Sequence, residues 1–160
     1  MDIIMDMSFK EKSTWISLLS TLIIFGYYFI SLMGLTELPD AQAKTAAGQL
    51  LMRAVVLSIV VEIIFQGMLA AINHQTASSG GDERDKYYQY KASNIAYSIL
   101  VIGVLITLGR ILLLEFNPGF DDYNSRLNIP LLTAHILMFS FILSEATRFS
   151  CPLYYYRKGT

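Results

Sequence analysis

DERDKYYQYKASNIAYSILVIGVLITLGRILLL, which occupies residues 82–114, opens with five charged residues and then runs from 92 to 109 without a charge. Asp82 is a good helix cap, and the acids that follow it favour the positive end of a helix dipole. Asp82 and Lys86 form an acid-to-base pair at the i,i+4 spacing, in the stabilising order. The stretch therefore predicts one long helix whose first two turns stand outside a membrane and whose remainder crosses it.

Three further apolar stretches, residues 15–35, 54–72 and 127–144, contain Glu62 as their only charged residue. A helix needs roughly 20 mostly apolar residues to cross a bilayer. Only 16% of the 160 residues are charged, whereas soluble domains carry about a quarter. The sequence therefore predicts an all-α polytopic membrane protein, a single transmembrane domain with four transmembrane helices. Their expected ranges are about 15–35, 49–72, 82–114 and 129–149.

The positive residues gather on one side of these four helices. Eight of the twelve lysines and arginines precede the first helix, lie between the second and third, or follow the fourth. Loops rich in lysine and arginine stay in the cytoplasm. The sequence thus predicts an N-in/C-in bundle, with both termini and the 73–91 loop in the cytoplasm. The eight positive residues on that side are Lys10, Lys12, Arg84, Lys86, Lys91, Arg148, Arg157 and Lys158.

Glu62 is the most conspicuous polar group within the predicted spans, where ionisable residues are functional candidates. It shares a helix face with Gln66 and is expected near mid-bilayer, without a second acid at its depth. Glu145 is expected near the inner end, paired with Arg148. One interpretation is an ion or proton pathway in which Glu62 acts with Gln66 and either His135 or Arg110. The favoured alternative is a neutral carboxyl that hydrogen-bonds a neighbouring helix, across a homo-oligomer if the chain self-associates.

Two other intramembrane groups have simpler explanations. Arg110 lies near the outer end of the third helix, so its side chain can reach the headgroups. His135 has no metal-binding neighbour in the sequence and is interpreted as a core histidine. On the third helix Ala96, Gly103 and Thr107 share a face with Arg110, and small residues there allow another helix to approach closely.

Several functional classes find no support in the sequence. The net charge of −1 lacks the basic excess of nucleic-acid-binding proteins, so no direct nucleic acid binding is predicted. No HExxH or GxSxG motif occurs, and the two histidines are predicted on opposite sides of the membrane. A single cysteine, Cys151, excludes an internal disulfide. No catalytic residue, metal or cofactor is therefore predicted, and the chain is expected not to be an enzyme.

Three segments carry a resemblance. The opening MSFKEKSTWISLL, the stretch DERDKYYQYKASNIAYSIL and the end LSEATRFSCPLYYYRKG resemble an uncharacterised family of small bacterial four-helix inner-membrane proteins. Members have an MSFxEKSAW-like start, a DERD loop and a YRRG-like C-terminus, from which Thr14 and Lys158 depart conservatively. Genes of this family often lie beside a helix-turn-helix transcription factor. The resemblance implies a bacterial inner (cytoplasmic) membrane location and a membrane partner for a cytoplasmic regulator.

All three segments fall on the predicted cytoplasmic side, where they would meet at one end of the bundle. The leading hypothesis is a non-enzymatic binding or sensory partner of a cytoplasmic helix-turn-helix regulator. A charged helix start offers a docking surface for a basic protein, or simply caps the third helix. A small ion- or proton-coupled transporter or channel using Glu62 is the alternative. The predicted partner-binding residues are Asp82, Glu83, Arg84, Asp85, Lys86 and Arg157.

Overall fold

The fold is a bundle of long helices in a computed structural model that describes residues 9–37, 39–72, 83–117, 119 and 129–158. Within these ranges there is no strand, and a short 3-10 turn, η1 (Gly34–Glu37), follows the first helix. Each of the four helices is long and apolar enough to cross a membrane, which confirms the predicted all-α, four-span class. They are α1 (Phe9–Met33), α2 (Asp40–Ile72), α3 (Glu83–Phe116) and α5 (Leu132–Lys158).

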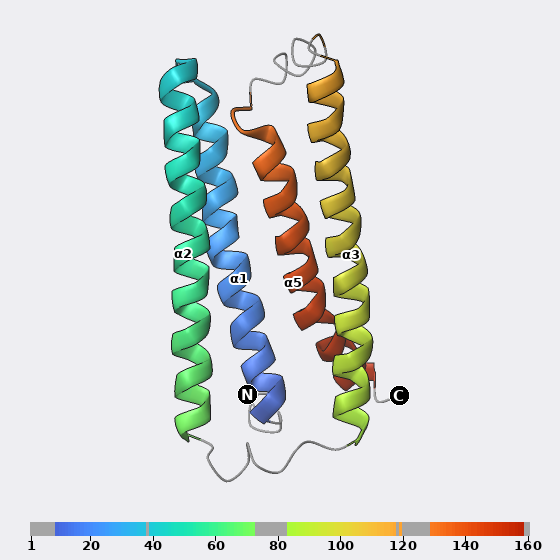
Figure 1. Cartoon of the computed structure of the whole chain (residues 1–160). Helices are drawn as coiled ribbons and strands as arrows, with labels where there is room; N and C mark the ends of the chain where they lie inside the picture. The colour runs from blue at the N-terminus through green and yellow to red at the C-terminus, as the bar shows by residue number, and fades with distance from the viewer. Residues whose placement is uncertain (1–8, 38, 73–82, 118, 120–128, 159–160) are drawn as a thin grey trace.

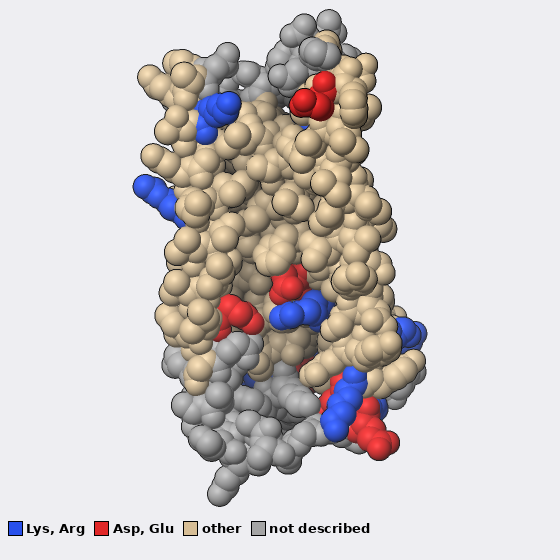
Figure 2. All heavy atoms as spheres, viewed as in Figure 1, with Lys and Arg blue, Asp and Glu red and all other residues tan. Residues whose placement is uncertain are grey.

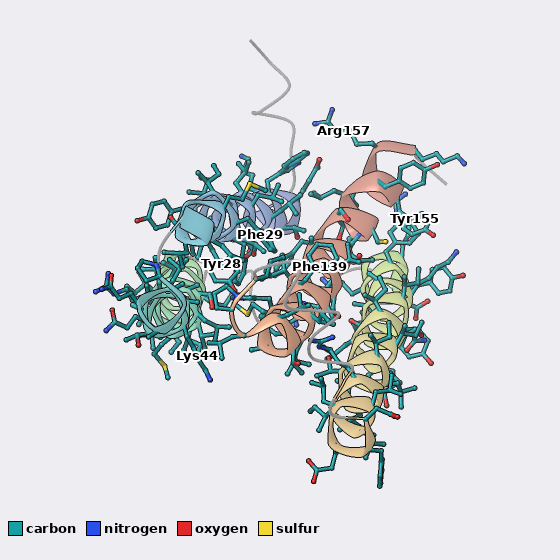
Figure 3. The ribbon with its side chains drawn as sticks, turned by 90° about the horizontal axis from the view of Figure 1, so that it is seen from above. Tyr28, Phe29, Lys44, Phe139, Tyr155 and Arg157 are labelled. Carbon is teal, nitrogen blue, oxygen red and sulfur yellow. The ribbon has the colours of Figure 1, made fainter. Side chains whose placement is uncertain are left out.

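The helices pack as two hairpins joined along one interface. In Figure 1 they stand side by side in the order α2, α1, α5, α3, and the two chain ends lie at the same end of the bundle. Helix α1 packs on α2 and α5, and α5 packs on α1 and, most extensively, on α3. Over the described residues α2 does not pack on α3. Figure 3 shows α5 between the first hairpin and α3, so α5 is the element that connects the two halves.

Small residues bring α3 and α5 close together. Ala96, Gly103 and Thr107 of α3 are buried, as the shared face in the sequence predicts for a helix contact. The hydroxyl of Ser144 on α5 donates a hydrogen bond of 2.8 Å to the Ala96 carbonyl. This contact is possible because short side chains let the two backbones approach.

Larger side chains fill the interface between the hairpins. Phe25 and Tyr28 of α1, Ala54 of α2, and Met138 and Ile142 of α5 form one buried cluster. A second cluster nearer the chain ends joins α1 to the last turns of α5. The outer helix faces remain apolar and exposed, which suits contact with lipid rather than water.

Three helices extend well beyond the ranges predicted from hydropathy, and the first of them, α1, begins at Phe9 rather than at about 15. Helix α2 begins at Asp40 rather than at about 49, because the Pro39 carbonyl accepts 2.9 Å hydrogen bonds from the N–H groups of Gln42 and Ala43. Helix α5 continues past the predicted end at 149, through the buried Pro152, to Lys158. Its last turns gain contacts with α3 that outweigh the hydrogen bond lost at Pro152.

Candidate functional site

The three segments singled out in the sequence meet at one end of the bundle. We call this the termini end: the start of α1, the start of α3 and the last two turns of α5. An ion pair of 3.7 Å joins the Arg157 Nε of α5 to the Glu11 Oε1 of α1. The Tyr156 hydroxyl of α5 donates a hydrogen bond to Asp85 of α3. The end of α5 is therefore tied to both of the other segments.

A cluster of tyrosines holds the start of α3 against the end of α5. Tyr88 is buried, and its ring stacks on Tyr155 with centroids 5.0 Å apart and planes 14° apart. The edge of Tyr156 completes the contact at 6.1 Å. Lys91 places its Nζ 4.9 Å from the centroid of the Tyr155 ring, a cation–π distance. These tyrosines thus do more than mark the headgroup level, because they lock two helices together.

The start of α1 joins this end through an apolar contact. Trp15 packs against a buried cluster formed by Leu18 of α1 with Phe149 and Leu153 of α5. Amphipathic Trp and Tyr rings are enriched where a membrane meets water. The termini end is therefore an aromatic, largely packed layer with charged groups around it.

The charged residues predicted to bind a partner divide into two groups here. Asp85 and Arg157 are engaged in the contacts described above, although Arg157 keeps 55% of its side chain exposed. Glu83, Arg84 and Lys86 are exposed at the start of α3. Asp82 lies outside the described residues. Figure 2 shows acidic and basic groups together at this end of α3, a surface suited to ion pairs with a partner of mixed charge.

A second polar group lies within the apolar band of the bundle. Arg148 and Glu145 of α5 form an ion pair of 3.4 Å, and Glu62 of α2 is close enough to Glu145 for electrostatic interaction. Figure 2 shows acidic and basic groups facing one another in a hollow between α2 and α3. The predicted Glu145–Arg148 pair is present, but the expectation that Glu62 has no acid at its depth was wrong.

The longer α2 explains this error. Since the helix begins at Asp40 and ends at Ile72, Glu62 lies about 33 Å from its start and about 15 Å from its end, at 1.5 Å per residue. It therefore lies about 9 Å past the midpoint of α2, on the side of the termini end. The side chain of Gln66, its predicted partner, is outside the described part of the chain.

His135 and Arg110 lie toward the other end of the bundle, away from Glu62. The His135 Nδ1 hydrogen-bonds with the Tyr28 hydroxyl, and the pair is buried between α5 and α1. The His135 Nε2 is also buried and has no hydrogen-bond partner among the described residues. The Arg110 Nε donates to the Thr133 Oγ1 at 3.0 Å. His135 is thus buried in the core, but a fully satisfied histidine was expected, and its Nε2 has no hydrogen-bond partner among the described residues.

His135 also stands at the wall of a cavity of about 650 Å³ between α1, α3 and α5. Phe29 and Phe139, whose rings meet edge to face with centroids 6.0 Å apart, form part of that wall. Both rings lie between α1 and α5 in Figure 3. The sequence did not indicate this cavity or the Tyr28 partner, because the residues involved come from three different helices.

In the described parts of the chain, no group of three or more His, Cys, Asp or Glu side chains could hold a metal ion. Comparisons with family models, curated proteins and solved structures give no match for this chain. The functional argument therefore depends on the geometry of the termini end, of the Glu62 hollow and of the cavity at His135.

Proposed function

We propose that this protein is a non-enzymatic membrane protein of the bacterial inner membrane that binds a cytoplasmic regulator at its termini end. The observation that carries the proposal is that three distant segments are joined there by the Arg157–Glu11 ion pair and the Tyr156–Asp85 hydrogen bond. A partner at this end would contact all three segments at once.

The packing at this end supports a binding role. The stacking of Tyr88 on Tyr155 fixes the first turns of α3, so the charges on those turns are held on a rigid helix. A rigid surface loses less conformational entropy when a partner binds. Glu83, Arg84 and Lys86 remain exposed for pairing, and charges of both signs select a partner by complementarity.

The charge distribution supports a cytoplasmic position for the termini end. Lysines and arginines are more numerous at this end than at the other, as cytoplasmic loops require. With both termini in the cytoplasm, the start of α3 also faces the cytoplasm, where a helix-turn-helix regulator would be found. The resemblance in the three segments supports the same choice of partner.

In a sensory role, α5 is the helix that would transmit a change within the membrane to the termini end. This helix reaches from Thr133, which bonds Arg110 near one end, to Arg157 at the other. It packs on α1 and on α3, so a shift of α5 against α3 would alter the contact of Tyr155, and a shift against α1 would alter that of Arg157. A signal within the membrane would in this way reach the docking surface.

A transporter or channel is the second candidate, and the Glu62 hollow favours it. Glu62, Glu145 and Arg148 place two acids and one base inside an otherwise apolar band. Intramembrane ionisable groups often mark ion pathways. If Glu62→Gln abolishes proton-coupled flux into liposomes that wild-type protein supports, transport replaces regulator binding as the function. A homo-oligomer is compatible with either role.

The test of regulator binding is a pull-down from native membranes in mild detergent, read by mass spectrometry. The variant Glu83→Ala/Arg84→Ala/Lys86→Ala removes exposed charges but keeps Asp85 for Tyr156. The control Lys44→Ala/Arg53→Ala removes exposed charges near the other end of α2. We expect one cytoplasmic protein to be lost only from the first variant, and its affinity for the purified chain to fall at least about tenfold.

An identical set of soluble proteins in all three samples would reject the docking surface. The charged start of α3 would then serve as a helix cap and topology signal. Retention of the partner by the first variant and its loss from the control would move the docking surface to the other end of the bundle.

A further inference from the structure

The cavity at His135 opens toward the bilayer. Its walls include Phe29 of α1, Ile102 and Ile106 of α3, and Phe139 of α5. Ile106 and Phe139 are more than half exposed on the lipid-facing surface. Its volume of about 650 Å³ lies within the range of small-molecule sites, about 300–1,000 Å³. A ligand would therefore enter from the membrane and would need a mainly apolar body.

His135 adds a requirement for a hydrogen-bond acceptor. The side chain is 5% exposed, and its Nδ1 pairs with the Tyr28 hydroxyl. When a phenol donates to Nδ1, the neutral imidazole carries its proton on Nε2. That buried Nε2–H has no acceptor in the described structure, and an unpaired buried donor is destabilising. Because Nε2 has almost no accessible surface, binding of an acceptor requires a rotation of the imidazole or of a lining side chain.

Arg110 adds a positive charge beside the cavity. It follows Ile106 by four residues and so lies one turn further along the same face of α3. Its Nε donates to Thr133, the neighbour of the lining residue Leu132. The two terminal nitrogens of the guanidinium have no partner in the described ranges. A guanidinium in this state suits a phosphate, which it binds through paired hydrogen bonds.

The depth of these groups matches the headgroup boundary. His135 lies in the first turn of α5, and Tyr28 is about 7 Å before the end of α1, at 1.5 Å per residue. The whole of α1 is about 37 Å long, whereas the hydrocarbon core is about 30 Å thick. The Tyr28–His135 pair therefore lies close to the level where acyl chains meet the polar headgroups.

From the cavity, the unpaired Nε2 and the neighbouring guanidinium, we propose that this site binds an anionic glycerophospholipid. The phosphate pairs with Arg110, an ester carbonyl accepts the hydrogen bond from His135, and an acyl chain lies against Phe29, Ile106 and Phe139. The proposal does not depend on the docking surface at the termini end. It supplies the proposed sensor with a ligand that is present in the membrane itself.

The test uses the purified full-length protein in a mild detergent, titrated with phosphatidylglycerol or with phosphatidylcholine of the same chains and followed by native mass spectrometry. Ile106→Trp fills the cavity. Leu105→Trp is the matched control, because Leu105 is outside the cavity lining and has a similar exposure, 62% against 55%. We expect wild type to retain one phosphatidylglycerol, Ile106→Trp to bind it at least tenfold more weakly, and Leu105→Trp to bind it within twofold of wild type.

Two further variants separate the polar contacts. Arg110→Gln should weaken binding of both lipids, because both carry a phosphate, and should remove the preference for phosphatidylglycerol, because the positive charge that selects a lipid of net negative charge is lost. His135→Phe should weaken both lipids, because both carry ester carbonyls. Thermal melting of each variant establishes that the fold is retained, and Ile106→Trp tests the site even if His135→Phe is unstable.

Three outcomes would overturn the proposal. Equal loss of lipid from Ile106→Trp and Leu105→Trp would indicate ordinary bilayer lipid only. Equal affinity of wild type for the two lipids would contradict the selection of an anionic lipid. Loss of a dimer from Ile106→Trp, with lipid binding unchanged, would make the cavity an interface between two copies. Each measurement is made without a regulator, so its failure is distinguishable from failure of the pull-down.

Discussion

Gly103 of α3 and Ser140 of α5 face each other so closely that a Cβ on Gly103 would lie 2.1 Å from both the Cβ and the Oγ of Ser140. We expect Gly103→Ala to destabilise the bundle by about 1–3 kcal/mol, the usual cost of overpacking. Gly109→Ala is the control, since an added Cβ there meets no atom within 4 Å. Unfolding of the purified variants by SDS would measure the difference.

The same contact predicts a rescue. The double variant Gly103→Ala/Ser140→Gly removes both clashing atoms and leaves the Ser140 Cα at an ordinary 3.5 Å. We expect it to recover most of the lost stability, less about 1 kcal/mol for a glycine within α5. A double variant no more stable than Gly103→Ala would show that the backbones do not approach at this point.

The stacking of Tyr155 on Tyr88 predicts a local effect at the termini end. Tyr155→Ala removes that stacking, worth about 1 kcal/mol beyond its buried area, and the contact with Lys91. We expect amide hydrogen exchange in the last turn of α5 to accelerate more than about tenfold. Tyr154→Ala, at an exposed neighbouring tyrosine, should have a much smaller effect. Similar acceleration in both variants would argue against the stack.

Orientation can be read from two introduced cysteines. In a Cys151→Ser background, we expect Lys158→Cys to be protected in intact cells from a membrane-impermeant maleimide, and Asn117→Cys to be labelled. The reason is the excess of positive charge at the end that carries Lys158. Labelling of cells opened by osmotic shock provides the control. The reverse pattern would place the termini end outside and exclude a cytoplasmic docking role.

The group formed by Glu62, Glu145 and Arg148 predicts that one substitution will offset the loss of stability caused by another. Arg148→Gln leaves Glu145 without its ion-pair partner beside a second carboxylate, and we expect a loss of about 1 kcal/mol. Adding Glu62→Gln should return most of this loss, because it removes the repulsion between the two acids. Thermal unfolding of the two single variants and the double variant measures the coupling. Additive effects would mean that Glu62 and Glu145 do not interact.

The four spans could be predicted from hydropathy alone, because each contains a long apolar stretch with few or no charged residues. The start of α2 at Asp40 could not, since the capping Pro39 precedes a stretch with little hydropathy signal. The end of α5 was missed for a different reason. Pro152 predicts that the helix ends, but the contacts of Tyr155 and Tyr156 with Tyr88 of α3 stabilise further helical turns.

The candidate sites could be predicted only where all of their residues come from one continuous stretch of sequence. The charged start of α3 is visible in the sequence, and so is the small-residue face around Gly103. The neighbours of Glu62 and His135 were not, because periodicity gives the face of a helix but not the helix it meets. Tyr28 and His135 are 107 positions apart, and only the packing of α1 on α5 brings them together.

Within the described ranges the two halves, α1 with α2 and α3 with α5, meet mainly where α1 packs on α5, and Ala54 of α2 reaches the core that they share. We call this contact between the halves the seam. The Tyr28–His135 bond lies toward one end of it and the Glu11–Arg157 pair at the other. A pivot of one half against the other would therefore have to stretch one of these two contacts.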